Sequence, residues 1–198
     1  MTLRKLTMLS GICLCSWLIT NGSALAKGRG QDRGMTAEEA IDDAEQALDA
    51  GRIGDASDEA EKLQKTHGLG KDLQHRVDLI VARCNLMLGE YGKSETQFAK
   101  LHKLSPDDAR LSEWYARALE GAGKTEPAFQ LLSELAEKDA LADGDSYWTL
   151  AQIERTKGKK EEALKHAETA LKKPILMQSD ELDKAIHKFI AELSSKQK

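Results

Sequence analysis

Residues 82–98, ARCNLMLGEYGKSETQF, carry a pattern that recurs along this chain of 198 residues. In this stretch an Ala stands seven residues before Gly89, a Ser stands five residues after it, and Phe98 stands nine residues after it. The same frame surrounds Gly51, Gly123 and Gly158. The four glycines lie 38, 34 and 35 residues apart, and a regular period of that length is typical of proteins built from stacked structural repeats.

Each part of the frame has a physical purpose in a pair of helices. Small residues such as Ala82 and Ser94 let two antiparallel helices approach closely. The glycine can adopt the left-handed backbone that ends the first helix, where a Cβ would be costly. The larger residues nine and twelve positions after the glycine fall on one face of the second helix. Because no stretch alternates as a strand does, the sequence predicts an all-α fold.

Local signals predict where several helices begin. Ser105 is predicted to cap a helix that has Pro106 in its first position. Asp143 is predicted to cap the first helix of the following repeat. Thr125 is predicted to open a second helix, with Pro127 in the first turn, where its missing N–H does no harm.

A last helix is predicted within residues 178–198. It should begin at Ser179 and Asp180 and run to about Leu193. Its apolar stripe consists of Leu182, Ala185, Ile186, Phe189, Ile190 and Leu193.

The frame resembles the tetratricopeptide repeat (TPR) family. The family's small, Gly, aromatic, aromatic and Pro positions are matched best by Ala82, Gly89, Tyr91, Phe98 and Pro106. The repeats fill residues 36–177, at about 37–70, 75–108, 109–142 and 144–177. The first repeat departs from the pattern at Ile53, Ala60 and Gly68.

The TPR resemblance implies an all-α solenoid of helix hairpins that forms a right-handed superhelix. The first helix of each repeat would line a concave groove, and residues 178–198 would form a capping helix and tail. The function it implies is recognition of protein or peptide partners, without chemistry.

The first 26 residues have the order of a secretory signal peptide. Arg4 and Lys5 precede a mostly apolar stretch of about 14 residues, and small residues follow, up to Ala26. Since about 20 apolar residues are needed to span a bilayer, we expect cleavage after Ala26, with a retained anchor as the alternative. Residues 27–35 hold three glycines and are predicted to be a flexible linker. We therefore expect an exported protein of the periplasm or cell envelope.

Charge and cysteine content exclude several function classes. The net charge of −4 gives no reason to expect nucleic acid as a partner. Removal of residues 1–26 takes away two basic groups and no acid, which leaves −6 and a single cysteine, Cys84, so no internal disulfide can form. We expect a buried, unreactive thiol there. The histidines lack metal-ligand spacing, and no nucleophile, acid and base cluster together, so we expect no enzyme, no cofactor and no metal.

The TPR resemblance also places particular residues in the groove. They are Arg76, Leu79, Arg83, Leu86 and Met87 from the second repeat, Arg110, Glu113 and Arg117 from the third, and Trp148 and Arg155 from the fourth. Five of them are arginines, whose guanidinium groups bind carboxylates through two parallel hydrogen bonds. The apolar members would supply pockets beside them. Our hypothesis is that the groove binds an acidic or C-terminal segment of a partner protein.

Three alternatives stay open at this stage. Arg110 and Arg117 could instead pair with the glutamates three residues further along the same helix, Glu113 and Glu120, as on an ordinary solvated face. Trp114 could pack between repeats, which we favour, or lie exposed on an interaction face. The protein could also be a structural homo-oligomer that dimerises through its C-terminal helix.

Overall fold

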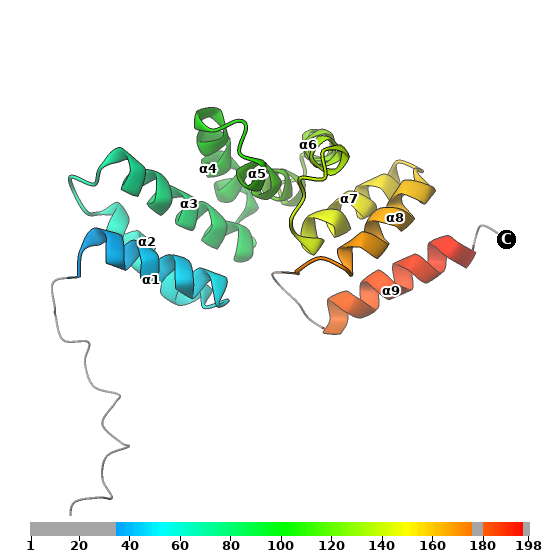
Figure 1. Ribbon diagram of the computed structural model, residues 1–198, viewed down its shortest axis with the longest axis horizontal. Helices are drawn as coiled ribbons and strands as arrows, with labels where there is room; N and C mark the ends of the chain where they lie inside the picture. Colours follow the sequence, from blue (N-terminus) through cyan, green and yellow to red (C-terminus); the bar gives the residue numbers. More distant parts are fainter. Residues whose placement is uncertain (1–34, 176–179, 196–198) are drawn as a thin grey trace, which may run out of the picture. The chain divides into compact units, whose positions relative to one another are not determined.

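The computed structural model describes residues 35–175 and 180–195, and within them the chain forms nine α-helices and no strand. The helices are α1 (Ala37–Asp49), α2 (Ile53–Gln64), α3 (Lys71–Met87), α4 (Tyr91–Leu104), α5 (Ala109–Gly121), α6 (Thr125–Glu137), α7 (Gly144–Thr156), α8 (Lys160–Ala170) and α9 (Asp180–Ser195) (Figure 1). The expectation of an all-α solenoid is confirmed. The proposed signal peptide, residues 27–34 of the proposed linker, and Ser179 lie outside the described residues.

The helices pack in chain order. α1 pairs with α2, α3 with α4, α5 with α6 and α7 with α8, and α9 packs against α8. The first helices of neighbouring pairs also touch one another, α1 with α3, α3 with α5 and α5 with α7. This arrangement places the side chains of consecutive first helices on one continuous face of the stack.

The glycines end the first helices in the way that the sequence predicted. Gly51, Gly89, Gly123 and Gly158 have φ angles of 73°, 77°, 77° and 78°. At each of them two backbone hydrogen bonds close the helix in the same manner. After α3, for example, the N–H of Gly89 donates to the carbonyl of Leu86, and the N–H of Glu90 donates to that of Asn85. The residue after each glycine is the N-cap of the second helix, so the two helices of each hairpin are joined by a short turn.

The small residues of the frame are buried where the helices cross. Ala82 is 0% exposed, and the hydroxyl of the equally buried Ser94 on α4 donates to the Ala82 carbonyl at 2.9 Å. Ala116 on α5 and Ala128 on α6 are both 0% exposed and belong to one buried core. Larger side chains such as Phe98 fill the remaining space between helices. The fold is therefore held by packing along its whole length.

Two of the predicted helix starts need comment. Ser105 does not cap α5, because it ends α4 and forms a turn in which its carbonyl accepts from the Asp108 N–H at 3.3 Å. Asp108 is the cap, and its side chain accepts from the Leu111 N–H at 3.0 Å. Asp143 does stand at the N-cap of α7, but its carboxylate makes no capping hydrogen bond. Thr125 begins α6 as predicted.

None of the helices in the described part of the chain is long and apolar enough to cross a membrane.

Candidate functional site

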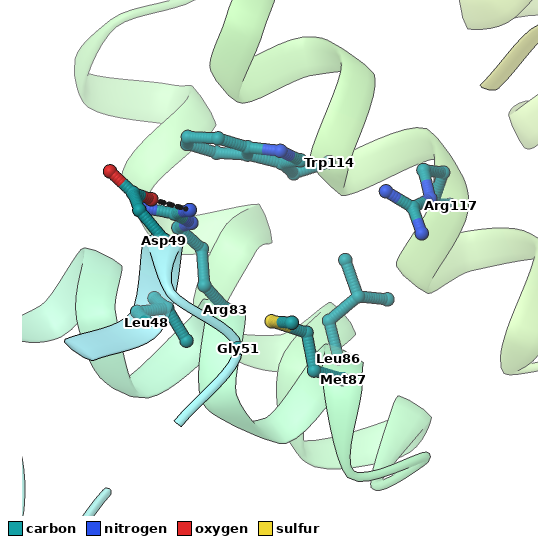
Figure 2. Close-up of a pocket in the computed structure, with 8 residues that line it drawn as sticks. All are labelled: Leu48, Asp49, Gly51, Arg83, Leu86, Met87, Trp114 and Arg117. Carbon is teal, nitrogen blue, oxygen red and sulfur yellow. Dashed lines mark hydrogen bonds and ion pairs between the residues drawn. The ribbon is translucent and has the colours of Figure 1, made fainter. Parts of the chain in front are cut away.

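Three pockets lie along the face made by the first helices and α9. The central pocket is lined by Leu48, Asp49, Gly51, Arg83, Leu86, Met87, Trp114 and Arg117 (Figure 2). The turn pocket is lined by Leu86, Met87, Leu88, Gly89, Tyr91, Arg117, Glu120, Gly121 and Thr149. The end pocket is lined by Trp148, Gln152, Arg155, Ala185, Lys188, Phe189 and Glu192. The first two pockets share Leu86, Met87 and Arg117 among their lining residues, so they adjoin each other.

The structure separates the predicted groove residues into two groups. Arg83, Leu86, Met87, Arg117, Trp148 and Arg155 line the pockets. Arg76, Leu79, Arg110 and Glu113 line none of the three. Leu79 is half-buried and packs against the core that surrounds Phe98, and the other three are held in ion pairs.

On α3, two arginines reach back to carboxylates of α1. The Arg76 guanidinium lies 2.6 Å from Asp42 and 2.7 Å from Glu45, and these hydrogen bonds, that of Glu45 first, raise the pKa of Arg76. Arg83 donates to Asp49 at 2.8 Å. The carboxylates of Asp42 and Asp49 are 62% and 67% exposed, so this group of ion pairs lies at the edge of solvent.

At the junction of α5 and α7 the acidic side chains are buried, while Arg110 is 36% exposed. Glu113 is 0% exposed, accepts from the backbone N–H of Asp143 at 2.9 Å and of Ala142 at 3.3 Å, and pairs with Arg110 at 3.1 Å. Arg110 also pairs with Asp143 at 2.8 Å. Burial acts to lower the pKa of Arg110, but its hydrogen bond and ion pair with Asp143 raise it overall. Glu113 therefore holds the α6–α7 connection to α5 and does not face a ligand.

The alternative interpretation of the α5 arginines is correct for one of them. Arg110 pairs with Glu113 three residues along the helix, as that interpretation expected. Arg117 instead forms an ion pair with Asp145 on α7, at 3.8 Å. One carboxylate oxygen of Glu120 is buried without a hydrogen-bond partner in the described part of the chain.

Trp114 joins the two groups of ion pairs. It is 8% exposed, which agrees with the expectation that it packs between repeats, and its ring lies 6.4 Å from that of Phe98. The guanidinium groups of Arg83 and Arg110 lie 4.5 and 4.9 Å from its ring centre. Each guanidinium group is attracted to the electron-rich face of the ring, and this attraction helps to hold both arginines in place. The same ring forms a wall of the central pocket.

The turn pocket contains an apolar surface that the sequence analysis did not place there. Leu88 is 55% exposed and Tyr91 is 40% exposed. Tyr91 comes so close to α5 because Gly121 has no side chain: a Cβ there would stand 2.3 Å from the tyrosine ring. The family pattern matched Tyr91 only as an aromatic position of the second repeat. Its contact with Gly121 depends on the register between α4 and α5, which the sequence does not give.

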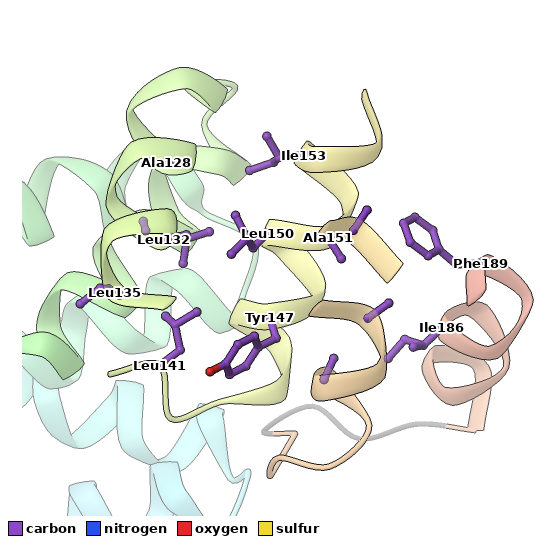
Figure 3. Close-up of a cluster of buried hydrophobic side chains, with 14 of the residues drawn as sticks. Ala128, Leu132, Leu135, Leu141, Tyr147, Leu150, Ala151, Ile153, Ile186 and Phe189 are labelled. Carbon is purple, nitrogen blue, oxygen red and sulfur yellow. The ribbon is translucent and has the colours of Figure 1, made fainter. Parts of the chain in front are cut away.

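The end pocket lies between α7 and the last helix. The rings of Trp148 and Phe189 meet edge to face at 4.9 Å, and the Arg155 guanidinium lies 4.5 Å from the Phe189 ring. Arg155 also lies 3.7 Å from Glu192. Figure 3 shows Phe189 and Ile186 of α9 turned toward α7 and α8, within the same core as Leu150 and Ala151. The sequence frame missed the α9 residues because they lie beyond the last repeat.

The described residues contain no group of three or more His, Cys, Asp or Glu side chains placed to hold a metal ion. Cys84 is a free thiol that is 2% exposed, and burial raises its pKa to about 11. A thiol of that pKa is almost entirely protonated at neutral pH and is a poor nucleophile.

Known structures share this arrangement of helices. A tetratricopeptide repeat protein from Parabacteroides merdae superposes with a TM-score of 0.58 over 80% of this chain, at 19% sequence identity. The chain has a tetratricopeptide repeat fold. Two structures of MamA, one of them of MamA MSR-1, superpose with TM-scores of 0.57 and 0.52 over 81% and 71% of this chain, at 17% and 16% identity.

The chain spans 59% of the length of the Parabacteroides protein. It spans 86% and 79% of the two MamA chains. No protein-family profile and no curated protein matches the sequence. At these identities the likeness concerns the fold, so function has to be argued from the pockets themselves.

Proposed function

We propose that this protein is a non-enzymatic interaction scaffold that binds a segment of a partner protein along the face of α1, α3 and α5. The observation that carries the proposal is that the central and turn pockets adjoin on this face and share Leu86, Met87 and Arg117 among their lining residues. An extended peptide segment fits such an elongated site, because it can place successive side chains in successive pockets.

The chemistry of the lining supports a protein partner. Leu88 and Tyr91 expose large apolar surfaces beside polar groups, a combination that is typical of interaction sites. Trp114 and the arginines belong to the residue types that contribute most binding energy in interfaces. The turn pocket has a volume of about 440 Å³, enough for a bulky side chain.

The composition of the N-terminal residues supports export, and we place the scaffold in the periplasm or at the cell envelope. Cleavage after Ala26 would release it from the membrane, and a retained apolar segment would anchor it there. N-terminal sequencing of the protein purified from its own envelope distinguishes the two.

The proposed partner segment is acidic. Arg83 and Arg117 both face the central pocket, and Asp49 is the one carboxylate among its lining residues. Each arginine already has an acidic neighbour, Asp49 at 2.8 Å and Asp145 at 3.8 Å, so a carboxylate of the partner would bind there in exchange for one of them.

Capture of the partner from envelope extract tests the proposal. The double variant R83E/R117E reverses both charges and should abolish capture, since the partner's carboxylates would then meet like charge. The matched control is K100E/K103E on α4, which changes the net charge equally at exposed lysines outside all three pockets. Full capture by R83E/R117E, with the fold intact by circular dichroism, would refute binding at this face.

Dimerisation through the C-terminal helix is the second candidate, and it has weaker support. Ile186, Phe189 and Leu193 are at most 5% exposed within a single chain, so half of the apolar stripe of α9 is already covered by its own solenoid. Of the rest, Leu182 and Ile190 are partly buried and Ala185 is exposed. Light scattering on residues 27–198 should give a monomer mass at every concentration. A mass that doubles with concentration would favour the dimer.

A further inference from the structure

Two of the three pockets on this face are wide enough for a bulky side chain. The central pocket has a volume of about 30 Å³, whereas the turn pocket and the end pocket have volumes of about 440 and 340 Å³. Pockets that bind ligands typically have volumes of about 300–1,000 Å³. A partner segment on this face therefore has two places for large side chains, and the proposed function uses only the first of them.

The end pocket lies on the other side of α7 from the turn pocket. Thr149 of α7 lines the turn pocket, and the preceding residue, Trp148, lines the end pocket. Trp148, Gln152 and Arg155 are spaced at i, i+4 and i+7, so they form one stripe of α7. A segment that leaves the turn pocket and crosses α7 therefore reaches the end pocket next.

Helix α9 supplies the opposite wall of the end pocket. Ala185, Lys188, Phe189 and Glu192 are spaced at i, i+3, i+4 and i+7, so they lie on one face of α9. Ala185 and Lys188 are exposed, although Phe189 beside them is buried in the core (Figure 3). The side of α9 that faces α7 is therefore partly open, and α9 contributes to the binding face.

The lining of the end pocket suits an aromatic ring. The rings of Trp148 and Phe189 lie 4.9 Å apart, and a third ring can pack against such a pair. Arg155 is paired with Glu192 at 3.7 Å, which leaves the positive charge of Lys188 in excess among the lining residues. That excess disfavours a basic side chain. An aromatic ring is the apolar group that also attracts cations at its face, so it complements both parts of the lining.

We propose that the end pocket binds an aromatic side chain of the same partner segment that occupies the turn pocket, so that the segment is anchored on both sides of α7. The inference rests on the proposed function and adds a second anchor and its chemistry. Neighbouring helices of a stack lie about 8–10 Å apart, and an extended segment advances about 3.3 Å per residue. The aromatic residue therefore stands about three positions from the apolar residue in the turn pocket.

Selection from a random peptide library tests this arrangement without knowledge of the partner. Phage that display flanked dodecapeptides are selected on the wild-type protein and, in parallel, on A185W, whose indole fills the end pocket from an exposed position of α9. Wild type should enrich an aromatic residue about three positions from a second bulky apolar residue, and A185W should enrich only the second. Enrichment of aliphatic or basic residues in place of the aromatic one, or the same pairing on A185W, would overturn the proposal.

Affinities of one selected, synthetic peptide then measure the second anchor. A185W should bind it about tenfold more weakly than wild type, because the aromatic side chain loses its site. The matched control A191W places the same indole at an exposed position of α9 outside the pocket and should bind normally. Equal affinities of wild type and A185W would overturn the second anchor.

A second peptide, with Ala in place of the aromatic residue, tests the same contact from the side of the ligand. It should bind wild type about tenfold more weakly than the first peptide does, and it should bind A185W with that same affinity, because the two changes remove one contact. Full affinity of the Ala peptide for wild type would overturn the proposal even if A185W did not fold.

A failure of the second anchor can be told apart from a failure of the proposed function. If R83E/R117E loses the selected peptide and A185W keeps it, the face of α1, α3 and α5 binds the segment and only the end-pocket contact is refuted. If wild type enriches no peptide, or R83E/R117E binds the selected peptide as wild type does, the proposed function is refuted as well.

Discussion

The α1–α3 and α5–α7 junctions use the same chemistry in two environments. At both, arginines of one first helix pair with carboxylates of a neighbouring first helix or its cap. Between α5 and α7 the acceptor Asp143 is 3% exposed, and its backbone N–H donates to Glu113 of α5, which is 0% exposed. Between α1 and α3 the acceptors Asp42 and Asp49 are 62% and 67% exposed. The comparison shows that the two junctions differ in the burial of their acidic side chains and not in the presence of an ion pair.

Removal of one carboxylate from each junction should give the largest difference. E113A should lower the free energy of unfolding by about 3–5 kcal/mol, because Arg110 and the Asp143 N–H lose a buried partner. E45A, which removes a carboxylate 34% exposed, should cost about 1 kcal/mol or less. Urea unfolding measures both. Equal losses would show that burial does not separate the two junctions.

Gly121 tests the close approach of α5 to Tyr91 of α4 beside the turn pocket. G121A should cost about 1–3 kcal/mol, because its Cβ would stand 2.3 Å from the Tyr91 ring. In a Y91A background the same substitution should stabilise the protein by about 0.5–1 kcal/mol, since alanine is the better helix former. Thermal unfolding of wild type, G121A, Y91A and the double variant gives the sign of each change in stability. If G121A stabilised the protein in both backgrounds, the close approach of Tyr91 would be contradicted.

The pH dependence of stability should carry a smaller signature of the buried junction. Burial raises the pKa of Asp143 above its ordinary value of 3.8, although its hydrogen bond with Arg110 opposes the shift. As pH rises through that value, the unfolded chain therefore loses this proton before the folded chain does, and stability falls with pH. The fall should begin near pH 3.8 and end above the raised pKa.

The variant D143N isolates this contribution, since an amide does not titrate. Urea unfolding of both proteins between pH 3.5 and 7 should show wild type losing stability relative to D143N as pH rises. Parallel curves for the two proteins would contradict a raised pKa at Asp143.

Sequence alone predicted the hairpins because their signals are local. Positions that require a positive φ or a small side chain can be recognised from the sequence without knowledge of their spatial neighbours. Gly89 and Ala82 are examples. The cap at Asp108 was missed because Ser105 and Asp108 are both suitable N-cap residues. The turn between them determines which of the two caps α5.

The candidate site was less predictable, because it depends on register between repeats. The frame placed Arg83 and Arg117 on the correct face, but it could not show that Asp49 reaches the first and Asp145 the second. The position of Tyr91 against Gly121 likewise follows from how α4 meets α5. Contacts between residues about 30 positions apart are set by the angle and offset of helix packing, which no short pattern encodes.

Photo-crosslinking from single positions tests the central claim most directly. A benzophenone amino acid replaces Met87, which lines both the central and turn pockets, or Leu104, which is 75% exposed at the end of α4 and outside all three pockets. In native envelope extract, we predict a discrete adduct from position 87 that R117Q removes, and none from position 104. An adduct from position 104 alone, or one from position 87 that R117Q leaves unchanged, would contradict binding on the face of the first helices.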